Sequence, residues 1–160
     1  MYETKHPGRG SHGVLSIGGI KTMRIVVAAV SSNRSMSGVS RHAANLVNGL
    51  LTRGEVSALH LLVAPWEHKY VCESITRTDS RLHVHAVQLR RGTLQRNLWY
   101  YRNLPGIAEQ LRADVVHFAY PSPLHASAFP CPTVVSLHDL YPYDIPSNFG
   151  FPKVDRKSVV

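Results

Sequence analysis

The sequence predicts an α/β domain built on an open, mostly parallel sheet with helices on both faces. Short, β-branched apolar runs alternate along the chain with longer segments in which apolar residues recur at helical spacing. The first of these runs is apolar almost throughout, as expected for a strand buried on both faces of a parallel sheet. A length of 160 residues, with 44% apolar and 18% charged residues, is sufficient for one domain with a hydrophobic core.

The first strand and the first helix are expected within residues 24–54. Residues 24–30, "RIVVAAV", form the apolar run of the strand. The helix is predicted from a stripe of five apolar residues at helical spacing: Val39, Ala43, Leu46, Val47 and Leu50. This stripe would cover the sheet, and Gly54 is expected to close the helix.

The rest of the pattern contains more strands and one further helical region. Strands are expected in four apolar segments: 58–64, 81–89, 114–118 and 133–137. The last two segments, "DVVHF" and "TVVSL", are expected to be buried. Residues 93–112 are helical in composition, but a helix there must break near Pro105. The predicted order is strand, helix, strand, strand, helix, strand, strand, which is typical of an α/β sheet.

The two ends of the chain do not follow this pattern. Residues 1–22 are expected to be a disordered or mis-called extension ahead of Met23, and the domain would span residues 23–160. After the last predicted strand no helix follows to cover it. A doubly wound domain normally continues at this point, so we expect the domain to be truncated at its C-terminus.

Charge and cysteine content restrict the partners and the setting. Eighteen Lys and Arg against ten Asp and Glu give a net charge of +8, which favours nucleic acid, phosphorylated metabolites or an acidic membrane surface. The two cysteines, Cys72 and Cys131, are too few for a disulfide scaffold, so a reducing cytoplasmic setting is expected. The longest apolar run, residues 25–30, is far shorter than the ~20 residues needed to cross a bilayer.

Residues 31–40 connect the first strand to the first helix, at the sheet edge where ligands of open α/β folds bind. A helix start there presents unpaired N–H groups and a positive dipole end to an anion. Gly38 would let a ligand approach the backbone, and Ser37 and Ser40 could cap the helix. The stretch lacks the three glycines of a dinucleotide fingerprint and the Gly-Lys-Ser/Thr of a P-loop. An ordinary capped turn remains the alternative.

Several histidines follow predicted strands. His138, next to Asp139, follows the last strand, where it could hold a substrate hydroxyl or play a structural part. The pair also fits a metal-dependent phosphohydrolase, but no further ligand lies at metal-binding spacing, so no metal site is predicted. His83 and His85 alternate onto one face of a strand and are expected to face solvent. His117 is expected to be buried and hydrogen-bonded.

The stretch "LRRGTLQRNLWYYRN", residues 89–103, mixes arginines with aromatic residues. Such a mixture can bind nucleic acid by phosphate pairing and stacking, or lie on an anionic membrane. Aromatic residues at helical spacing also pack inward with arginines opposite them, and that structural interpretation is favoured.

Four segments in order resemble the N-terminal domain of a family 4 glycosyltransferase: "MRIVVAAV", "SGVSRHAANLVNGLL", "ADVVHF" and "PTVVSLHDLYPYDIPSNFGFPK". The resemblance covers roughly residues 23–153. It implies one half of a GT-B architecture, in which two Rossmann-like domains face a cleft. It also implies transfer of a sugar from a nucleotide-sugar donor to an acceptor with retention of configuration, and no cofactor.

The resemblance also implies roles for individual residues. Gly38, with its neighbours Ser37 and Val39, corresponds to a glycine-rich loop whose backbone approaches the donor diphosphate. His138 corresponds to a histidine that reaches the cleft near the reacting groups, and is the candidate catalytic residue. Asp139 and Asp144 correspond to positions on the acceptor side.

The chain departs from the family pattern in two respects. Met36 and Ser37 precede a single Gly38, where family members usually carry two adjacent glycines. Family members bind the nucleotide in a C-terminal domain with a basic pair and a glutamate motif. Neither is found here, so this polypeptide alone is expected to be inactive.

The expected partners follow from the same comparison. They are a nucleotide-sugar donor and a glycan or lipid-linked acceptor. The positive charge is compatible with peripheral contact at an anionic inner membrane surface, whereas nucleic acid is disfavoured. The alternative is a non-catalytic basic α/β module that binds nucleic acid or acidic lipid.

Overall fold

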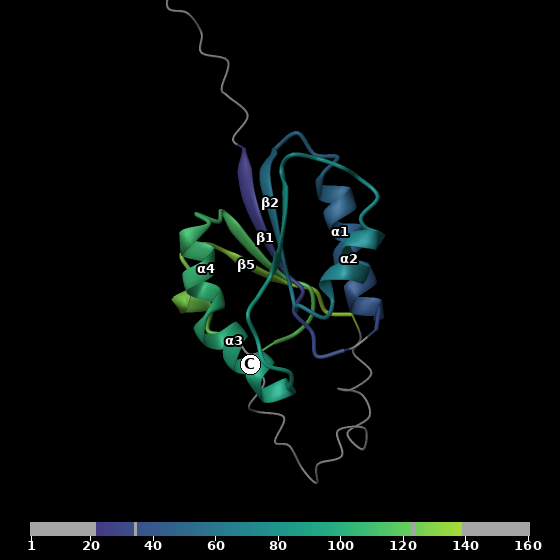
Figure 1. The fold of residues 1–160 in the computed structure, drawn as a ribbon. Helices are drawn as coiled ribbons and strands as arrows, with labels where there is room; N and C mark the ends of the chain where they lie inside the picture. The colour runs from purple at the N-terminus through teal and green to yellow at the C-terminus, as the bar shows by residue number, and fades with distance from the viewer. Residues whose placement is uncertain (1–21, 34, 123, 139–160) are drawn as a thin grey trace, which may run out of the picture.

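A computed structural model describes residues 22–33, 35–122 and 124–138 of the chain. It contains one sheet of five strands in the order β3-β2-β1-β4-β5, and every neighbouring pair is parallel (Figure 1). The strands are β1 Met23–Ala28, β2 Val56–Val63, β3 Leu82–Ala86, β4 Val115–Phe118 and β5 Thr133–Val135. This is a Rossmann-like order, which reverses direction between β1 and β4.

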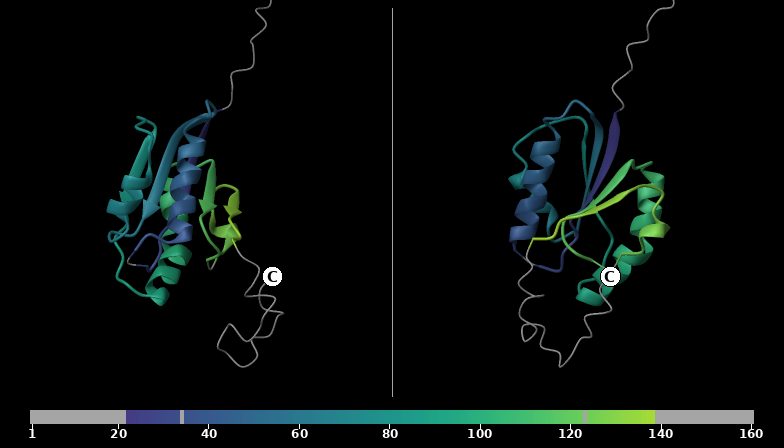
Figure 2. Two further views of the ribbon diagram at one scale, coloured as in Figure 1. Left: turned by 90° about the vertical axis from the view of Figure 1, so that its right-hand side faces the viewer. Right: turned by 180° about the vertical axis from the view of Figure 1, so that it is seen from behind.

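Helices cover both faces of the sheet, as predicted. They are α1 Gly38–Leu50, α2 His68–Ser74, α3 Thr93–Arg102 and α4 Leu104–Gln110, with a short 3₁₀ turn at Ala126–Ala128. Helices α1 and α2 lie on one face, and α3 and α4 lie on the other (Figure 2). Within the described residues, no helix is long and apolar enough to cross a membrane.

The hydrophobic core has two layers, one on each side of the sheet. In β1, Ile25 and Val27 pack in the layer beneath α1 and α2, while Val26 and Ala28 pack in the layer beneath α3 and α4. Both layers need apolar side chains because alternate residues of a strand point to opposite faces. This explains why the strand is apolar almost throughout.

Helices α3 and α4 break where the sequence predicted. The first helix ends at Arg102, Asn103 caps it, and Pro105 lies in the first turn of α4. Proline is tolerated there because its missing N–H would be unpaired in any case. Trp99 and Tyr100 are buried against the sheet, which confirms the inward packing of two of the aromatic residues.

Three expectations about the elements were wrong. Helix α2, between β2 and β3, was not predicted, because only one of its residues, Val71, is buried, and no apolar stripe forms. Strand β5 is not buried: Val134 is 48% exposed, since β5 is the edge strand of the described sheet. Helix α1 ends at Leu50 with Leu51 as its cap, so Gly54 does not close it.

Candidate functional site

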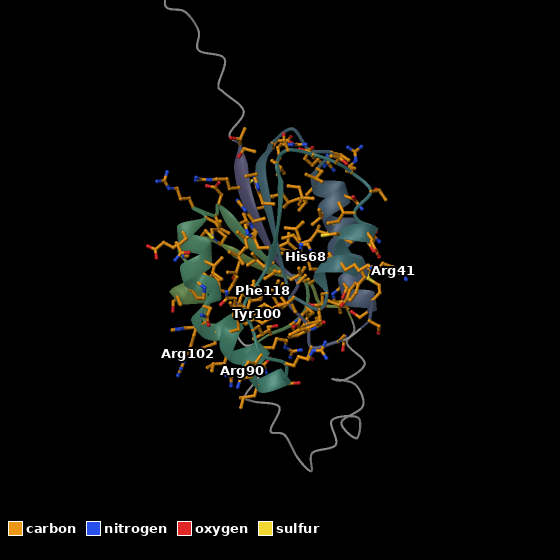
Figure 3. The ribbon with its side chains drawn as sticks, viewed as in Figure 1. Arg41, His68, Arg90, Tyr100, Arg102 and Phe118 are labelled. Atoms are coloured by element: carbon orange, nitrogen blue, oxygen red, sulfur yellow. The ribbon has the colours of Figure 1, made fainter. Side chains whose placement is uncertain are left out.

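The candidate site lies at the carboxyl ends of β1, β4 and β5, where the strand order reverses. In open α/β sheets this switch point forms the crevice in which ligands bind. Two tyrosine hydroxyls fix the end of β1 here: Tyr100 donates to the carbonyl of Val30 at 3.1 Å, and Tyr120 donates to the same carbonyl. Tyr100 stacks on Phe118, and Figure 3 places both rings within the molecule. These aromatic side chains therefore hold the end of β1 in place at this edge of the sheet.

The start of α1 is capped and open to solvent. Ser37 is the N-cap, and its hydroxyl accepts a hydrogen bond from the Ser40 amide at 3.2 Å. Gly38, the first helical residue, is exposed, and a Cβ built on it would meet no atom within 4 Å. The side chain of Val39 packs toward the core, so only its backbone is available to a ligand.

Two amides at this helix start are left for a ligand. Among the described residues, the N–H groups of Gly38 and Val39 have no hydrogen-bond acceptor, whereas the next two amides are bonded to Ser37. Unpaired amides at the positive end of a helix dipole favour an anion.

A buried carboxylate, Glu67, joins this junction to the end of β2. The residue is fully buried, and both of its oxygens accept hydrogen bonds. Ser31 donates twice, from its amide at 2.8 Å and from its hydroxyl at 2.5 Å. Three more donors complete the set: the Ala64 amide at 3.2 Å, the Tyr70 hydroxyl at 3.1 Å and the Ser40 hydroxyl at 3.4 Å. Glu67 thus holds the first residue of the loop and the first turn of α1 in one network.

The negative charge of Glu67 contributes to the pKa of the neighbouring Tyr70. Burial first, and then the negative charge of Glu67, raise the pKa of Tyr70 to about 12. Tyr70 therefore stays protonated at neutral pH and acts as a donor to the carboxylate.

Three histidines gather at the ends of β4, β5 and the first turns of α1. The ring of His42 lies edge-on to that of His138, with 4.6 Å between the centroids. Ser136 bridges His42 to the third ring, His117: its hydroxyl is 3.1 Å from Nε2 of His42 and 3.0 Å from Nε2 of His117. One hydroxyl has a single proton to donate, so at least one of the two rings must donate to Ser136.

The electrostatics of this cluster favour the neutral form of His42 and of His117. Burial is the main cause that lowers the pKa of His42, and the nearby His138 lowers it further. Burial also lowers the pKa of His117, followed by the charges of His42 and His138. Nδ1 of His117 is buried and has no hydrogen-bond partner among the described residues.

His138, the predicted catalytic residue, is exposed at this edge. Its Nε2 donates to the backbone carbonyl of Ala119, which can only accept. In its neutral form the ring carries its proton on Nε2, and Nδ1 is then a hydrogen-bond acceptor.

The structure thus links two of the predicted features and adds residues that sequence reasoning missed. Through His42, the first turns of α1 contact His138, so Gly38 and His138 belong to one edge. Glu67 and His42 were not predicted; the available signals were a lone acid after a buried strand and a histidine near a helix start. Asp139 and Asp144 lie outside the described residues.

The histidine pair predicted on one strand, His83 and His85, lies beside a third histidine. His83 and His85 lie on one face of β3, and His60 of β2 joins them, with its Nδ1 3.1 Å from Nε2 of His85. His83 is exposed as predicted, whereas His85 is half-buried. Within the part of the chain that the structure describes, no group of three or more His, Cys, Asp or Glu is arranged to hold a metal.

These features define a class of protein: a Rossmann-like domain whose switch point combines an open helix start with a histidine cluster. The family model described as Glycosyltransferase Family 4 matches residues 36–158, more than half of the chain. The chain belongs to glycosyltransferase family 4. The matched range includes both Gly38 and His138. Comparison with curated proteins and comparison with solved structures each gave no match.

Proposed function

We propose that this domain forms the acceptor side of a retaining glycosyltransferase that uses a nucleotide-sugar donor. The observation that carries the proposal is the shared edge of the α1 start and His138. The amides of Gly38 and Val39 offer two hydrogen bonds to an anion, and the exposed ring of His138 offers an acceptor nitrogen nearby. Family membership supports sugar transfer as the reaction that this edge serves.

In this proposal the two features act on different parts of the reaction. The bond between the anomeric carbon and the diphosphate oxygen breaks, the oxygen of the acceptor hydroxyl forms a new bond to that carbon, and the hydroxyl proton passes to the departing diphosphate. The amides of Gly38 and Val39 stabilise the charge that develops on the departing diphosphate. Nδ1 of His138 accepts a hydrogen bond from a hydroxyl of the sugar or the acceptor and fixes its position. The nucleotide is held by a donor-binding domain facing this edge, as in the GT-B architecture.

The rate of sugar transfer by the His138→Ala variant tests the role of this histidine. With a donor-binding domain supplied, we expect kcat/KM to fall about 100-fold, because a misplaced hydroxyl reacts more slowly. The matched control is His125→Ala, which removes an exposed histidine away from this edge. Urea unfolding of both variants should match the wild type. An unchanged kcat/KM in His138→Ala would contradict the proposal.

A further inference from the structure

Helix α3 exposes an apolar stripe on the side away from the core. Leu94 is 77% exposed, Leu98 39% and Tyr101 50%. Positions i, i+4 and i+7 lie on one face of a helix, so the three side chains form a continuous strip. Trp99 and Tyr100 on the other side already anchor α3 to the sheet. Tyr101 also stacks on the exposed ring of His125, with 5.9 Å between the centroids, so the strip ends on a ring that already has a partner.

Arginines flank this strip and carboxylates do not. Arg90 and Arg91 precede α3, and Arg102 is in its last turn. Figure 3 shows Arg90 and Arg102 on the same side of the molecule. Residues 88–104 contain no Asp or Glu, and both ion pairs recorded among the described residues lie elsewhere. The strip thus has an arginine at each end, Arg90 before it and Arg102 after it, while the guanidinium of Arg91 lies over the ring of Trp66.

A shallow groove runs beside the strip and contains donors suited to a phosphate. Its lining residues are Gln88, Leu89, Arg90, Gln95, Leu98, Trp99 and Asn103. The guanidinium of Arg90 matches the geometry of a phosphate group, and three carboxamides add N–H donors. Leu98 belongs to both the groove and the strip, so an anionic head and an apolar chain could be bound side by side.

We propose that α3 docks on the surface of an anionic phospholipid bilayer. Leu94, Leu98 and Tyr101 enter the boundary between headgroups and acyl chains, while Arg90 and Arg102 bind lipid phosphates. A second copy of this face would bring like charges together. Nucleic acid would leave the leucines without an apolar partner. This inference goes beyond the proposed function, because binding to lipid does not require sugar transfer.

Sedimentation with vesicles tests the proposal. We compare vesicles of phosphatidylcholine alone with vesicles of equal parts phosphatidylcholine and phosphatidylglycerol. The wild type should bind the anionic vesicles at least about tenfold more tightly, since its arginines are attracted to the negative surface. Leu94→Gln with Leu98→Gln should weaken binding about tenfold without changing the charge. Arg90→Gln with Arg102→Gln should weaken it similarly and reduce the dependence on salt.

The matched control is Arg41→Gln, which removes an exposed charge from α1 on the opposite side of the molecule (Figure 3). It should bind vesicles like the wild type. Circular dichroism and urea unfolding establish that each variant is folded. The proposal is overturned by a wild type that does not bind, by an Arg41→Gln loss as large as that of the α3 variants, or by leucine variants that bind normally. Normal binding by the leucine variants, with retention on DNA at the same salt, would identify a polyanion surface instead.

Discussion

At the scale of single residues, Glu67 has the largest structural role at the candidate site. Its carboxylate is inaccessible to solvent, and its five hydrogen bonds all come from N–H or O–H donors. A buried carboxylate is unfavourable unless it is fully hydrogen-bonded, and this one is. The donors belong to three separate segments, so Glu67 determines how the β1–α1 junction sits against the end of β2.

Replacing Glu67 by alanine should destabilise the domain strongly. The change leaves the buried donors of Ser31 and Ala64 without an acceptor, and we expect the free energy of unfolding to fall by about 3 kcal/mol. Urea unfolding followed by circular dichroism measures it. Glu73→Ala, at an exposed position of the neighbouring helix α2, should change it by less than about 0.5 kcal/mol. Equal stability of the two variants would show that the network around Glu67 is not structural.

At the scale of elements, one residue at the start of α1 stabilises the helix, and the next residue leaves open space beside the backbone. The hydroxyl of Ser37 caps the helix, whereas Gly38 contributes no side chain and has open space beside it. Its backbone does not require the left-handed conformation that favours glycine. The fold of the described residues therefore does not require a glycine at this position.

Two substitutions should distinguish the contribution of Ser37 to stability from the contribution of Gly38 to binding. Ser37→Ala should lower the free energy of unfolding by about 1 kcal/mol, because the cap is lost. Gly38→Ala should leave stability unchanged or slightly higher, since alanine is the better helix former. The same Gly38→Ala should weaken binding of uridine diphosphate, because the new methyl group obstructs access to the amides of residues 38 and 39. Backbone NMR shifts at residues 38 and 39 during titration with this diphosphate measure the binding. Wild-type binding by Gly38→Ala would remove the diphosphate from this helix start.

Elements with a periodic apolar pattern were predictable, and contacts between distant segments were not. Strand β1 and helix α1 follow from burial on fixed faces, which leaves a period in the sequence. Helix α2 has seven residues and one buried side chain, so its sequence has no such period. Glu67 and His42 could not be predicted as site residues for another reason. Their partners lie 36 and 94 positions away, at Ser31 and Ser136, and only the folded sheet brings these segments together.

At the scale of the whole molecule, the sheet carries two separate histidine clusters. One, at the carboxyl edge, contains His42 and His117; the other, on the face of β2 and β3, contains His60 and His85. Burial and then neighbouring histidines lower the pKa of all four below the ordinary value of 6.5. The folded protein thus binds fewer protons than the unfolded chain when the pH falls below this value.

The stability of the molecule should therefore decrease on the acid side of neutrality. A group whose pKa is lowered by folding stabilises the fold fully above its unfolded pKa, and this contribution is lost as the pH falls through the folded value. The histidine contribution is then present above pH 6.5 and declines below it. Hydrogen bonds from Arg81 lower the pKa of Asp79 to about 2, so a second decline follows below the ordinary carboxyl value of 3.8. At the other end, Tyr70, with its pKa raised to about 12, stabilises the fold below pH 10 and loses this contribution above it.

A series of urea unfolding experiments across pH measures this profile. We expect a plateau between about pH 7 and pH 9, because burial also raises the pKa of the Cys72 and Cys131 thiols from 9.0. A first decline on the acid side is expected between pH 6.5 and pH 5. Replacing His85 and His117 together by glutamine should flatten that first decline, because one titrating ring is removed from each cluster. His125→Gln, an exposed histidine outside both clusters, should leave its slope unchanged. If the wild type is equally stable at pH 5 and pH 7.5, the rings are not held neutral by the fold, and the sheet does not couple its histidines to folding.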